Sequence, residues 1–418
     1  MIPIAKPYLG EEEANVAKGV ILSGWVTQGP KVKEFEDAFA SYVGSKHACA
    51  VSSCTTAMHL ALLAVGVKPG DVVITVSHSF IATANVVRHC GAEPVFVDID
   101  KNTFNMSPES LKQCLSEDCE IRDGELFYRD VLALAVGESP LCRLIKDEKA
   151  KVQDCRIGRV AAIMPAHQMG MPCDSNNILP LAEEYNIPIV EDAACAIGSE
   201  IKINNKWEKI GKPHGDIACF SFHPRKVITT GDGGMITTNN PEYDKQFRLL
   251  RQHGMSVSDT ARHSARKIIF EEYVTTGFNY RMTDIQAAVG IEQLKKLPEI
   301  IKNYRNIDIL YHKYLCDIDW LRLPEEPEYS RTNYQSYPVR VLINTPLPRN
   351  ELMQYLMDNG ASSRPGIMNA HQEKPYSNLI YKLPGSEKGR DEVILFPIYK
   401  GLEENDVKVI SDLIHKIG

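Results

Sequence analysis

The sequence has no excess of basic residues and no long hydrophobic run. Lys and Arg number 47 against 54 Asp and Glu, which gives a formal net charge of -7. Such a balance offers no basic face to nucleic acid or to an acidic membrane. No apolar segment approaches the length that crosses a bilayer, and charge and proline interrupt the first residues before an apolar run develops. We therefore expect a cytoplasmic protein that binds neither nucleic acid nor membrane.

Cysteines with the spacing of a metal site are also scarce. Most of the 11 cysteines, such as Cys49, Cys195 and Cys219, lie inside apolar runs and suggest no disulfide framework. Four others share one stretch without a C-x-x-C pair or a histidine among them: Cys114, Cys119, Cys142 and Cys155. We therefore expect reduced thiols and no zinc site.

Seven short apolar runs are present in the first part of the chain. They cover residues 47–53, 71–76, 93–100, 160–167, 187–192, 217–223 and 233–238. Most are separated by amphipathic stretches of helical length, and this alternation is typical of a mostly parallel sheet covered by helices. The sequence therefore predicts an α/β fold with a seven-stranded sheet in a large domain over residues 1–250.

The pattern changes after about residue 250. A helix-rich section is followed by strand-like runs and helix-like segments at 336–343, 349–360, 393–399 and 403–417. We expect a smaller α+β domain over residues 251–418. Residues 115–157 are charged and interrupt the strand rhythm, so they are interpreted as an insertion on the surface.

Asp192 ends one of the apolar runs and Lys226 follows another, at the sheet edge where ligands of α/β proteins bind. A pyridoxal phosphate site needs a lysine that forms an imine, a carboxylate for the pyridine nitrogen, phosphate donors and a flat group against the ring. Lys226, beside Arg225 and sheltered from water, would have its ammonium form disfavoured. Taken singly, Lys226 also fits a solvated surface lysine, and Asp192 fits a helix cap or a structural ion pair.

Hydroxyl and aromatic residues complete this set. Thr55 and Thr56 stand where a strand gives way to a helix, whose first N–H groups bind phosphate, and Ser221 adds a hydroxyl. Phe80 follows the second strand and would lie flat on the ring. The alternatives are capping or turn chemistry for the three hydroxyl residues and burial in the core for Phe80.

The order of six long motifs resembles the DegT/DnrJ/StrS family of sugar aminotransferases, which has the aspartate-aminotransferase fold (fold type I). The motifs are SGWVTQGP from Ser23, VSSCTTAMHLAL from Val51, SHSFIATANVV from Ser77, EDAACAIGS from Glu191, FSFHPRKVITTGDGGM from Phe220 and GFNYRMTDIQAAVG from Gly277. The resemblance implies the following contacts with pyridoxal 5'-phosphate: Lys226 as the imine lysine, Asp192 at the pyridinium, Thr55, Thr56 and Ser221 at the phosphate, and Phe80 against the ring. It also implies that Asn279 reaches the phosphate of a neighbouring subunit, in a homodimer with shared active sites.

Three positions depart from the family pattern. Cys54 stands where glycine is common, Cys195 where glutamine or histidine is more familiar, and Asp232 where glutamate is usual. Cys195 is expected near the ring, without an assigned polar contact. The stretch 115–157 is longer than the family pattern.

The resemblance implies an aminotransferase that moves an amino group from an amino acid, L-glutamate, to a nucleotide-linked keto-deoxysugar. The product would be an amino sugar for surface polysaccharide, lipopolysaccharide or secondary metabolites. The alternatives are a keto-cyclitol aminotransferase, a sugar dehydratase, in which histidine would replace Lys226, and a non-catalytic binding or regulatory protein, which would have no chemical reason to keep Lys226 and Asp192 together. Further candidates for the substrate pocket are Trp25, Gln28, His167, Gln168, Arg364 and His371.

Overall fold

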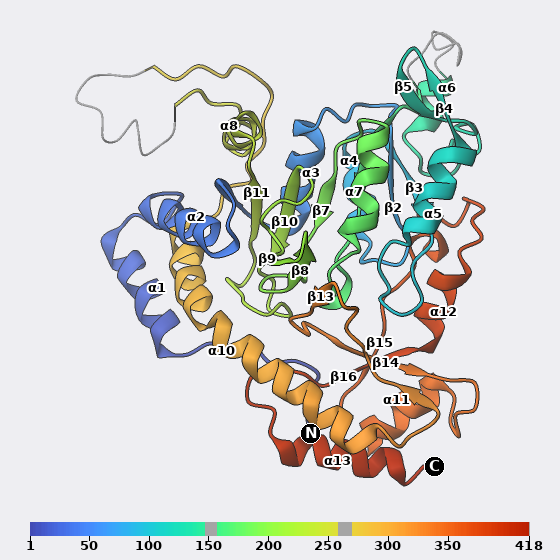
Figure 1. The fold of residues 1–418 in the computed structure, drawn as a ribbon. Coiled ribbons are helices and arrows are strands. Elements are labelled where there is room, and N and C mark those ends of the chain that lie inside the picture. Colours follow the sequence, from blue (N-terminus) through green and yellow to red (C-terminus); the bar gives the residue numbers. More distant parts are fainter. Residues whose placement is uncertain (147–156, 258–269, 418) are drawn as a thin grey trace.

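The chain folds around one large sheet (Figure 1). In the computed structural model, which describes residues 1–146, 157–257 and 270–417, the strands run in the orders β1-β11-β10-β7 and β6-β2-β3, and bridges from Ile163 to Ile189 and from Ala166 to Asp192 join β7 to β6. The strands are β1 His47–Val51, β2 Val72–Val76, β3 Glu93–Val97, β6 Val160–Met164, β7 Val190–Asp192, β10 Ile217–Ser221 and β11 Gly234–Thr238. Within this sheet only β11 is antiparallel to its neighbours, so the predicted seven-stranded, mostly parallel sheet is confirmed.

Both faces of this sheet are covered by helices. Ala50 of β1 belongs to the hydrophobic core that includes α2 (Pro30–Val43), whereas the next residue, Val51, belongs to the core of α3 (Cys54–Ala64). Successive side chains of a strand point to opposite faces of the sheet, so the side chains on both faces are buried under helices. This two-sided burial explains why the strands are continuous apolar runs rather than alternating ones.

The remaining elements of this part cover the sheet or extend from it. They are α4 Ala82–His89, α5 Pro108–Gln113, α7 Ser175–Glu184, β8 Glu200–Ile203, β9 Lys206–Lys209 and α8 Pro241–Leu250. Strands β8 and β9 form a hairpin that pairs with β13 (Ser330–Arg331). This hairpin connects β7 to β10, where a helix would be the usual connection between parallel strands.

Helix α10 (Asp284–Leu315) joins the large sheet to the C-terminal part of the chain (Figure 1). It packs against α1 (Glu11–Ser23) and α2, and also against α13 (Glu404–His415). One hydrophobic core accordingly extends from Phe220 in β10 to residues of α13.

The C-terminal part contains a four-stranded antiparallel sheet in the order β12-β14-β16-β15. The strands are β12 Leu321–Arg322, β14 Tyr337–Val341, β15 Arg364–Pro365 and β16 Val393–Phe396, and this part also contains the helices α11 Arg349–Asp358 and α12 Pro384–Glu392. The strands and helices expected after residue 336 are therefore confirmed. The domain boundary at residue 250 stays a prediction, because the shared core crosses it.

The insertion is partly embedded in the protein. It contains a hairpin of β4 (Cys119–Arg122) with β5 (Glu125–Tyr128) and helix α6 (Leu141–Lys146). Phe127 and Leu141 are buried, and Leu141 packs in the same core as strands β2 and β3. The interpretation of this stretch as a surface insertion is wrong for these residues, because their apolar side chains complete that core. Residues 147–156, with Cys155, lie outside the described part.

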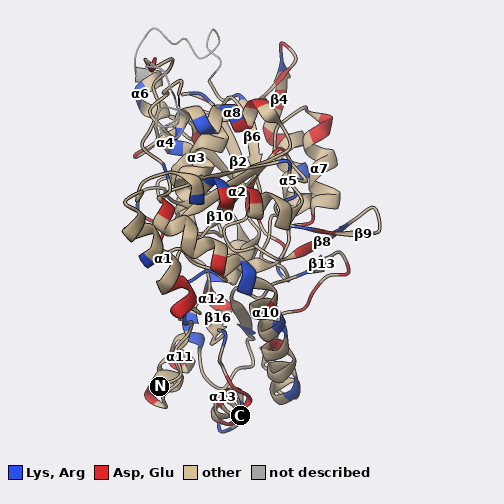
Figure 2. Ribbon diagram, turned by 90° about the vertical axis from the view of Figure 1, so that its left-hand side faces the viewer, with Lys and Arg blue, Asp and Glu red and all other residues tan. Residues whose placement is uncertain are grey.

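Charges of both signs are distributed along the chain. Figure 2 shows Lys and Arg interspersed with Asp and Glu over the helices and strands in this view. Across the described ranges, the helices lack the combination of length and hydropathy that spanning a membrane requires.

Candidate active site

Asp192 is the last residue of β7 and is 7% exposed. Its Oδ2 accepts a hydrogen bond of 2.7 Å from the Thr83 hydroxyl, and its Oδ1 accepts one of 3.1 Å from the backbone N–H of Ala194. Ser79 lies 2.8 Å from the Thr83 hydroxyl, so the hydroxyls of Ser79 and Thr83 form a chain that ends at the carboxylate. Hydrogen bonds donated to a carboxylate favour its ionised form, which is the form that holds a pyridinium proton.

Lys226 lies on the turn that follows β10, and its Nζ donates a hydrogen bond of 3.0 Å to the sulfur of Cys195. Burial alone lowers the pKa of Lys226, but the Cys195 sulfur and the Asp192 carboxylate outweigh burial and hold the pKa above its ordinary value. The expectation that the ammonium form is disfavoured is therefore wrong for the polypeptide itself. The amine thus lies at the strand end of β7 that carries Asp192, three residues before Cys195.

Cys195 makes a polar contact that we do not predict from the sequence. Its sulfur accepts from Lys226, and its backbone oxygen accepts a hydrogen bond of 2.8 Å from the side chain of Asn333, which is fully buried. The same amide group of Asn333 donates to Ile197 at 2.8 Å. Asn333 therefore fixes the backbone that carries Cys195.

The start of α3 provides donors for a phosphate. Ser53 is the N-cap, and the Thr56 hydroxyl takes part in its capping box, as the capping alternative anticipated. The backbone N–H groups of Cys54 and Thr55, and the Thr55 hydroxyl, have no partner within the part of the chain that the structure describes. First-turn N–H groups without an acceptor form an anion site together with the helix dipole.

A glycine brings the neighbouring strands close to this helix start. Ser221 at the end of β10 and Val51 at the end of β1 both pair with Gly234. A Cβ atom on Gly234 would lie 2.4 Å from the backbone of Ser53, so only glycine fits there. The Ser221 hydroxyl accepts a long hydrogen bond, 3.4 Å, from the backbone N–H of His223. Only strand β11 lies between Ser221 and the end of β1.

Phe80 lies in the loop between β2 and α4 and is 64% exposed, which excludes the core alternative. The loop before it is held by the C-terminal part of the chain. The Ser77 hydroxyl is 2.6 Å from Nδ1 of His371, and Nδ1 of His78 is 2.8 Å from Oδ1 of Asn369. The backbone around Phe80 is thus fixed while its ring stays open to a ligand.

Asn279 lies on an extended segment beside β1. Its neighbours Phe278 and Tyr280 stack at 4.8 Å, and both rings pack against His59 of α3. Asn279 is exposed, and its Oδ1 accepts a hydrogen bond from Arg281. Because neighbouring side chains of an extended chain alternate, Asn279 faces away from α3 of its own subunit.

The residues named as further pocket candidates lie in different settings. His167 is buried and contacts Glu191 at 3.0 Å and the backbone N–H of Cys173 at 2.9 Å, and Gln168 is buried beside His78. His371 is the buried partner of Ser77, whereas Arg364 is exposed on β15. Trp25 donates to the backbone of Gln28 at 3.2 Å. The structure therefore gives His167 and His371 positions within the scaffold rather than on an open surface.

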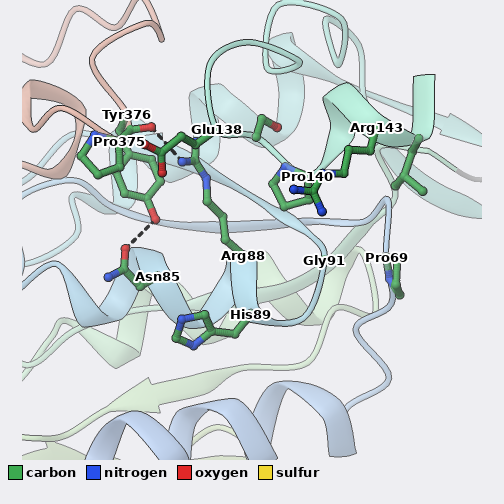
Figure 3. A pocket seen from close by; sticks show the side chains of 12 residues that line it. Pro69, Asn85, Arg88, His89, Gly91, Glu138, Pro140, Arg143, Pro375 and Tyr376 are labelled. Carbon is green, nitrogen blue, oxygen red and sulfur yellow. Dashed lines mark hydrogen bonds between the residues drawn. The ribbon is translucent and has the colours of Figure 1, made fainter. Parts of the chain in front are cut away.

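A pocket of about 620 Å³ lies elsewhere (Figure 3). Its wall includes Pro140 of the insertion, and Arg88 lies over the ring of Tyr376 at 3.8 Å. Arg88 is in the last turn of α4, whereas Thr83, which bonds Asp192, is in the first turn. No candidate cofactor residue lines this pocket, so it is separate from the Lys226 site.

Thr83 and Gly234 were not singled out from the sequence. The signal for Thr83 is its spacing: it lies three residues after Phe80, in the first turn of the helix that leaves the same strand end. The signal for Gly234 is the pair of glycines after Lys226, but the close approach to Ser53 depends on the strand order.

The described side chains fit pyridoxal phosphate. They supply an amine, a carboxyl group held by two donors, open N–H groups at a helix start and an exposed aromatic ring at one sheet edge. A sequence model of the DegT/DnrJ/EryC1/StrS aminotransferase family matches residues 7–120 and 146–415.

The chain belongs to this aminotransferase family. It is 31% identical, over all of its length and 97% of the relative, to the spore coat polysaccharide biosynthesis protein SpsC of Bacillus subtilis. The aminotransferase TlmJ of Streptoalloteichus hindustanus superposes with a TM-score of 0.80 at 29% identity, covering 100% of this chain and 98% of TlmJ. Spr1654 of Streptococcus pneumoniae, described as a sugar aminotransferase in its PMP form, superposes with a TM-score of 0.82 at 25% identity over the full length of both chains.

Several expectations are thereby confirmed. The protein is a pyridoxal-phosphate-dependent aminotransferase of fold type I, and the resemblance to the DegT/DnrJ/StrS family is correct. Residues 121–145 of the insertion fall between the two matched segments. The roles of individual site residues stay predictions.

Proposed function

We propose that this aminotransferase moves an amino group from L-glutamate to the keto group of a nucleotide-linked deoxysugar, with Lys226 as the lysine that holds the cofactor. The observation that carries the proposal is the approach of the Lys226 amine to the strand end where Asp192 is held by Thr83. The sugar acceptor is supported by two relatives, the spore coat polysaccharide biosynthesis protein SpsC and Spr1654, which is described as a sugar aminotransferase. A product used in surface polysaccharide or lipopolysaccharide, and a cytoplasmic location, stay predictions.

The side chains have distinct tasks in this proposal. Pyridoxal phosphate, when bound, supplies an electron sink for the carbanion left when the α-proton of the amino donor departs. Asp192 would keep the ring nitrogen protonated through the oxygen atoms that Thr83 and Ala194 orient. Lys226, when its amine is free, would take the α-proton of the amino donor on Nζ and deliver it to the cofactor carbon to which Nζ was bonded; in the second half of the reaction it would move a proton in the opposite direction.

The phosphate and the ring would be held by groups that are open in the polypeptide. The N–H groups of Cys54 and Thr55 and the hydroxyls of Thr55 and Ser221 would bind the phosphate, while Thr56 keeps the helix start in place. Phe80 would cover one face of the ring, which gives a physical reason for a phenylalanine that is 64% exposed.

A homodimer with shared active sites is part of the proposal. Asn279 faces away from its own α3, and two apolar rings in the segment before it are open to solvent: Phe270 is 85% exposed and Tyr273 is 65% exposed. Exposed apolar side chains near one another are typical of a protein interface. Asn279 would thus reach the phosphate bound by the partner subunit.

The visible absorption spectrum tests the lysine and the donor together. Wild type is expected to carry the band of the lysine-bound cofactor and to lose it when L-glutamate is added, because the amino group moves to the cofactor. Lys226→Ala should lack that band, whereas Lys206→Ala, which removes an exposed lysine of β9, should behave like wild type. A band that persists and responds to glutamate in Lys226→Ala would show that another lysine holds the cofactor.

The acceptor is tested by the return of the band. Enzyme first converted with L-glutamate is mixed with nucleotide-linked 3-keto or 4-keto deoxysugars, or with a keto-cyclitol. Return of the band with a nucleotide-linked sugar alone supports the proposed acceptor. Return with the cyclitol alone favours the cyclitol alternative, and a spectrum that no amino donor changes favours the non-catalytic one.

A further inference from the structure

Cys195 is the cysteine that contacts the Lys226 amine. Its sulfur lies 3.0 Å from Nζ, and no other cysteine in the described part of the chain accepts a hydrogen bond from this amine. Cys195 is partly exposed, whereas Cys54 and Cys219 nearby are buried. The contact therefore joins one accessible thiol to one amine at the cofactor site.

The position of this sulfur is set by the scaffold. Cys195 lies three residues after Asp192, on the turn that follows β7, and Asn333 holds its backbone oxygen at 2.8 Å. Asn333 is fully buried and also bonds Ile197. The backbone that carries the sulfur is thus held at the strand end that carries Asp192.

An amine and a thiol at this distance share a proton unequally. Thiols lose their proton at lower pH than lysine ammonium groups do, so a proton shared by such a pair resides on the amine. A charged amine does not attack an aldehyde until it loses its proton. The Cys195 sulfur consequently affects both where the amine lies and when it can react.

We propose that Cys195 is a positioning residue for Lys226, which holds the amine at the cofactor site whenever that amine is not bonded to pyridoxal phosphate. Its thiol is then the reactive one of the site. This inference rests on the proposed role of Lys226 as the cofactor-holding lysine.

The other sulfurs near the site differ in their chemistry. Burial raises the pKa of Cys54 and of Cys219 well above the ordinary thiol value, and the Asp192 carboxylate adds to this rise. These two thiols stay protonated and inert at neutral pH. Selective alkylation of Cys195 over Cys54 and Cys219 is therefore expected.

The first experiment measures how fast the cofactor-free full chain regains the visible band at a series of pH values after pyridoxal phosphate is added. In Cys195→Ala the amine loses the neighbour that keeps it charged, so the midpoint of the pH profile should move to lower pH. A shift of one pKa unit gives about ten-fold more neutral amine below the midpoint. Cys219→Ala, whose sulfur does not contact Nζ, is the control and should keep the wild-type midpoint.

Cys195→Ser separates position from charge. A serine hydroxyl keeps a polar partner for the amine but does not ionise in this range, so its midpoint should also fall while its rate at high pH stays near that of wild type. The alanine variant should be slower than the serine variant at high pH. If Cys195→Ala does not fold, the serine variant alone decides the midpoint.

The second readout is alkylation of the full chain by iodoacetamide, followed by mass spectrometry. Cys195 should be labelled in the cofactor-free chain much faster than Cys54 or Cys219, and less after pyridoxal phosphate is bound. Borohydride reduction and peptide mapping identify the lysine that carries the cofactor. A cofactor found on another lysine overturns the proposed role of Lys226. A cofactor found on Lys226, with midpoints unchanged in both Cys195 variants, overturns only the role of Cys195.

Discussion

Asp192 receives two hydrogen bonds from its own chain before any ligand contributes one. The Thr83 hydroxyl and the Ala194 N–H occupy one lone pair on each carboxylate oxygen, and Ser79 supports Thr83. Both donors stabilise the negative charge in a setting that is only 7% exposed. The orientation of the Asp192 carboxylate is thereby fixed before a pyridinium ring binds.

Asp192→Asn should slow the first half-reaction strongly. An amide of the same shape cannot stabilise the protonated ring nitrogen by charge, so we expect the rate with L-glutamate to fall by roughly a hundred-fold or more, as for loss of one preorganised electrostatic partner. Stopped-flow absorbance gives this rate. Thr83→Val, which removes only the orienting hydroxyl, should cause a smaller loss, and equal losses in the two variants would contradict the separate roles.

Single residues could be predicted from the sequence where a strand end marks them. Asp192 ends an apolar run, Lys226 and Phe80 each follow one, and the topology then brings these strand ends to one edge. The contact of Cys195 with Lys226 could not be predicted, because it joins two turns whose separation depends on the pairing of β7 with β10. The sequence-based expectation of a lowered Lys226 pKa is wrong for the same reason. Arg225 is the neighbour along the chain, whereas the groups that raise the pKa in the folded protein are the Cys195 sulfur and the Asp192 carboxylate.

The insertion is an element whose burial was not visible in its composition. Leu141, on α6, is fully buried in the core that contains strands β2 and β3, while Leu132 of the same insertion is 55% exposed. Charged residues before and after these leucines, such as Arg129, Asp130 and Arg143, conceal the apolar pattern in the sequence. The helix is nevertheless part of the folded unit.

Leu141→Ala should destabilise the protein and Leu132→Ala should not. Truncation of a buried leucine costs about 2–5 kcal/mol, whereas exposed substitutions stay within about 0.5 kcal/mol. Urea denaturation followed by circular dichroism measures both changes. Equal, small effects would mean that the insertion packs only loosely on the core.

Helix α2 is connected to β1 and α8 by a buried carboxylate. Glu36 is 2% exposed, and its oxygens lie 2.6 Å from Nη1 of Arg251 and 2.7 Å from Nη1 of Arg248. The backbone N–H of Ala50 donates to the same carboxylate at 3.0 Å. Burial alone raises the pKa of Glu36, but the two guanidinium groups outweigh burial and hold the pKa below its ordinary value of 4.5.

This lowered pKa predicts a loss of stability in acid. A carboxyl group whose pKa is lower in the folded state contributes its stability fully above its unfolded pKa, near 4.5, and loses it as the pH falls through the folded value. Glu36→Gln should lower the free energy of unfolding at pH 7 by about 3–5 kcal/mol, because the buried Arg251 loses its anionic partner and the partly exposed Arg248 keeps only Asp244. Its stability should then depend less on pH below 4.5 than that of wild type. Glu34→Gln, at an exposed position, is the control for urea denaturation across this pH range.

At the scale of elements, the sequence predicts what each strand is but not how strands connect. The seven apolar runs appear as seven strands because two-sided burial requires continuous apolar residues. The hairpin of β8 and β9 and the antiparallel course of β11 were not predicted, since both depend on which strand end lies beside which. Gly234 shows the same limit, because its need for glycine appears only once β11 lies against Ser53.

For the whole molecule, the open question is whether one chain contains a complete site. Asn279 is exposed and faces away from α3, whereas Lys226 and Asp192 lie together in one chain. If Asn279 completes the partner's site, each site of a dimer combines Lys226 and Asp192 of one subunit with Asn279 of the other. Two defects in different subunits can then leave one intact site.

Coexpression of two inactive variants tests this arrangement. Lys226→Ala with Asn279→Ala should form mixed dimers in which one of two sites has both residues. Random pairing gives half mixed dimers, so we expect about a quarter of wild-type activity with L-glutamate and an active acceptor. Lys226→Ala with Asp192→Asn is the matched control and should stay inactive, because both residues belong to the same subunit's half of the site. Absence of recovery in the first mixture, with dimers present in sedimentation, would mean that Asn279 acts within its own chain.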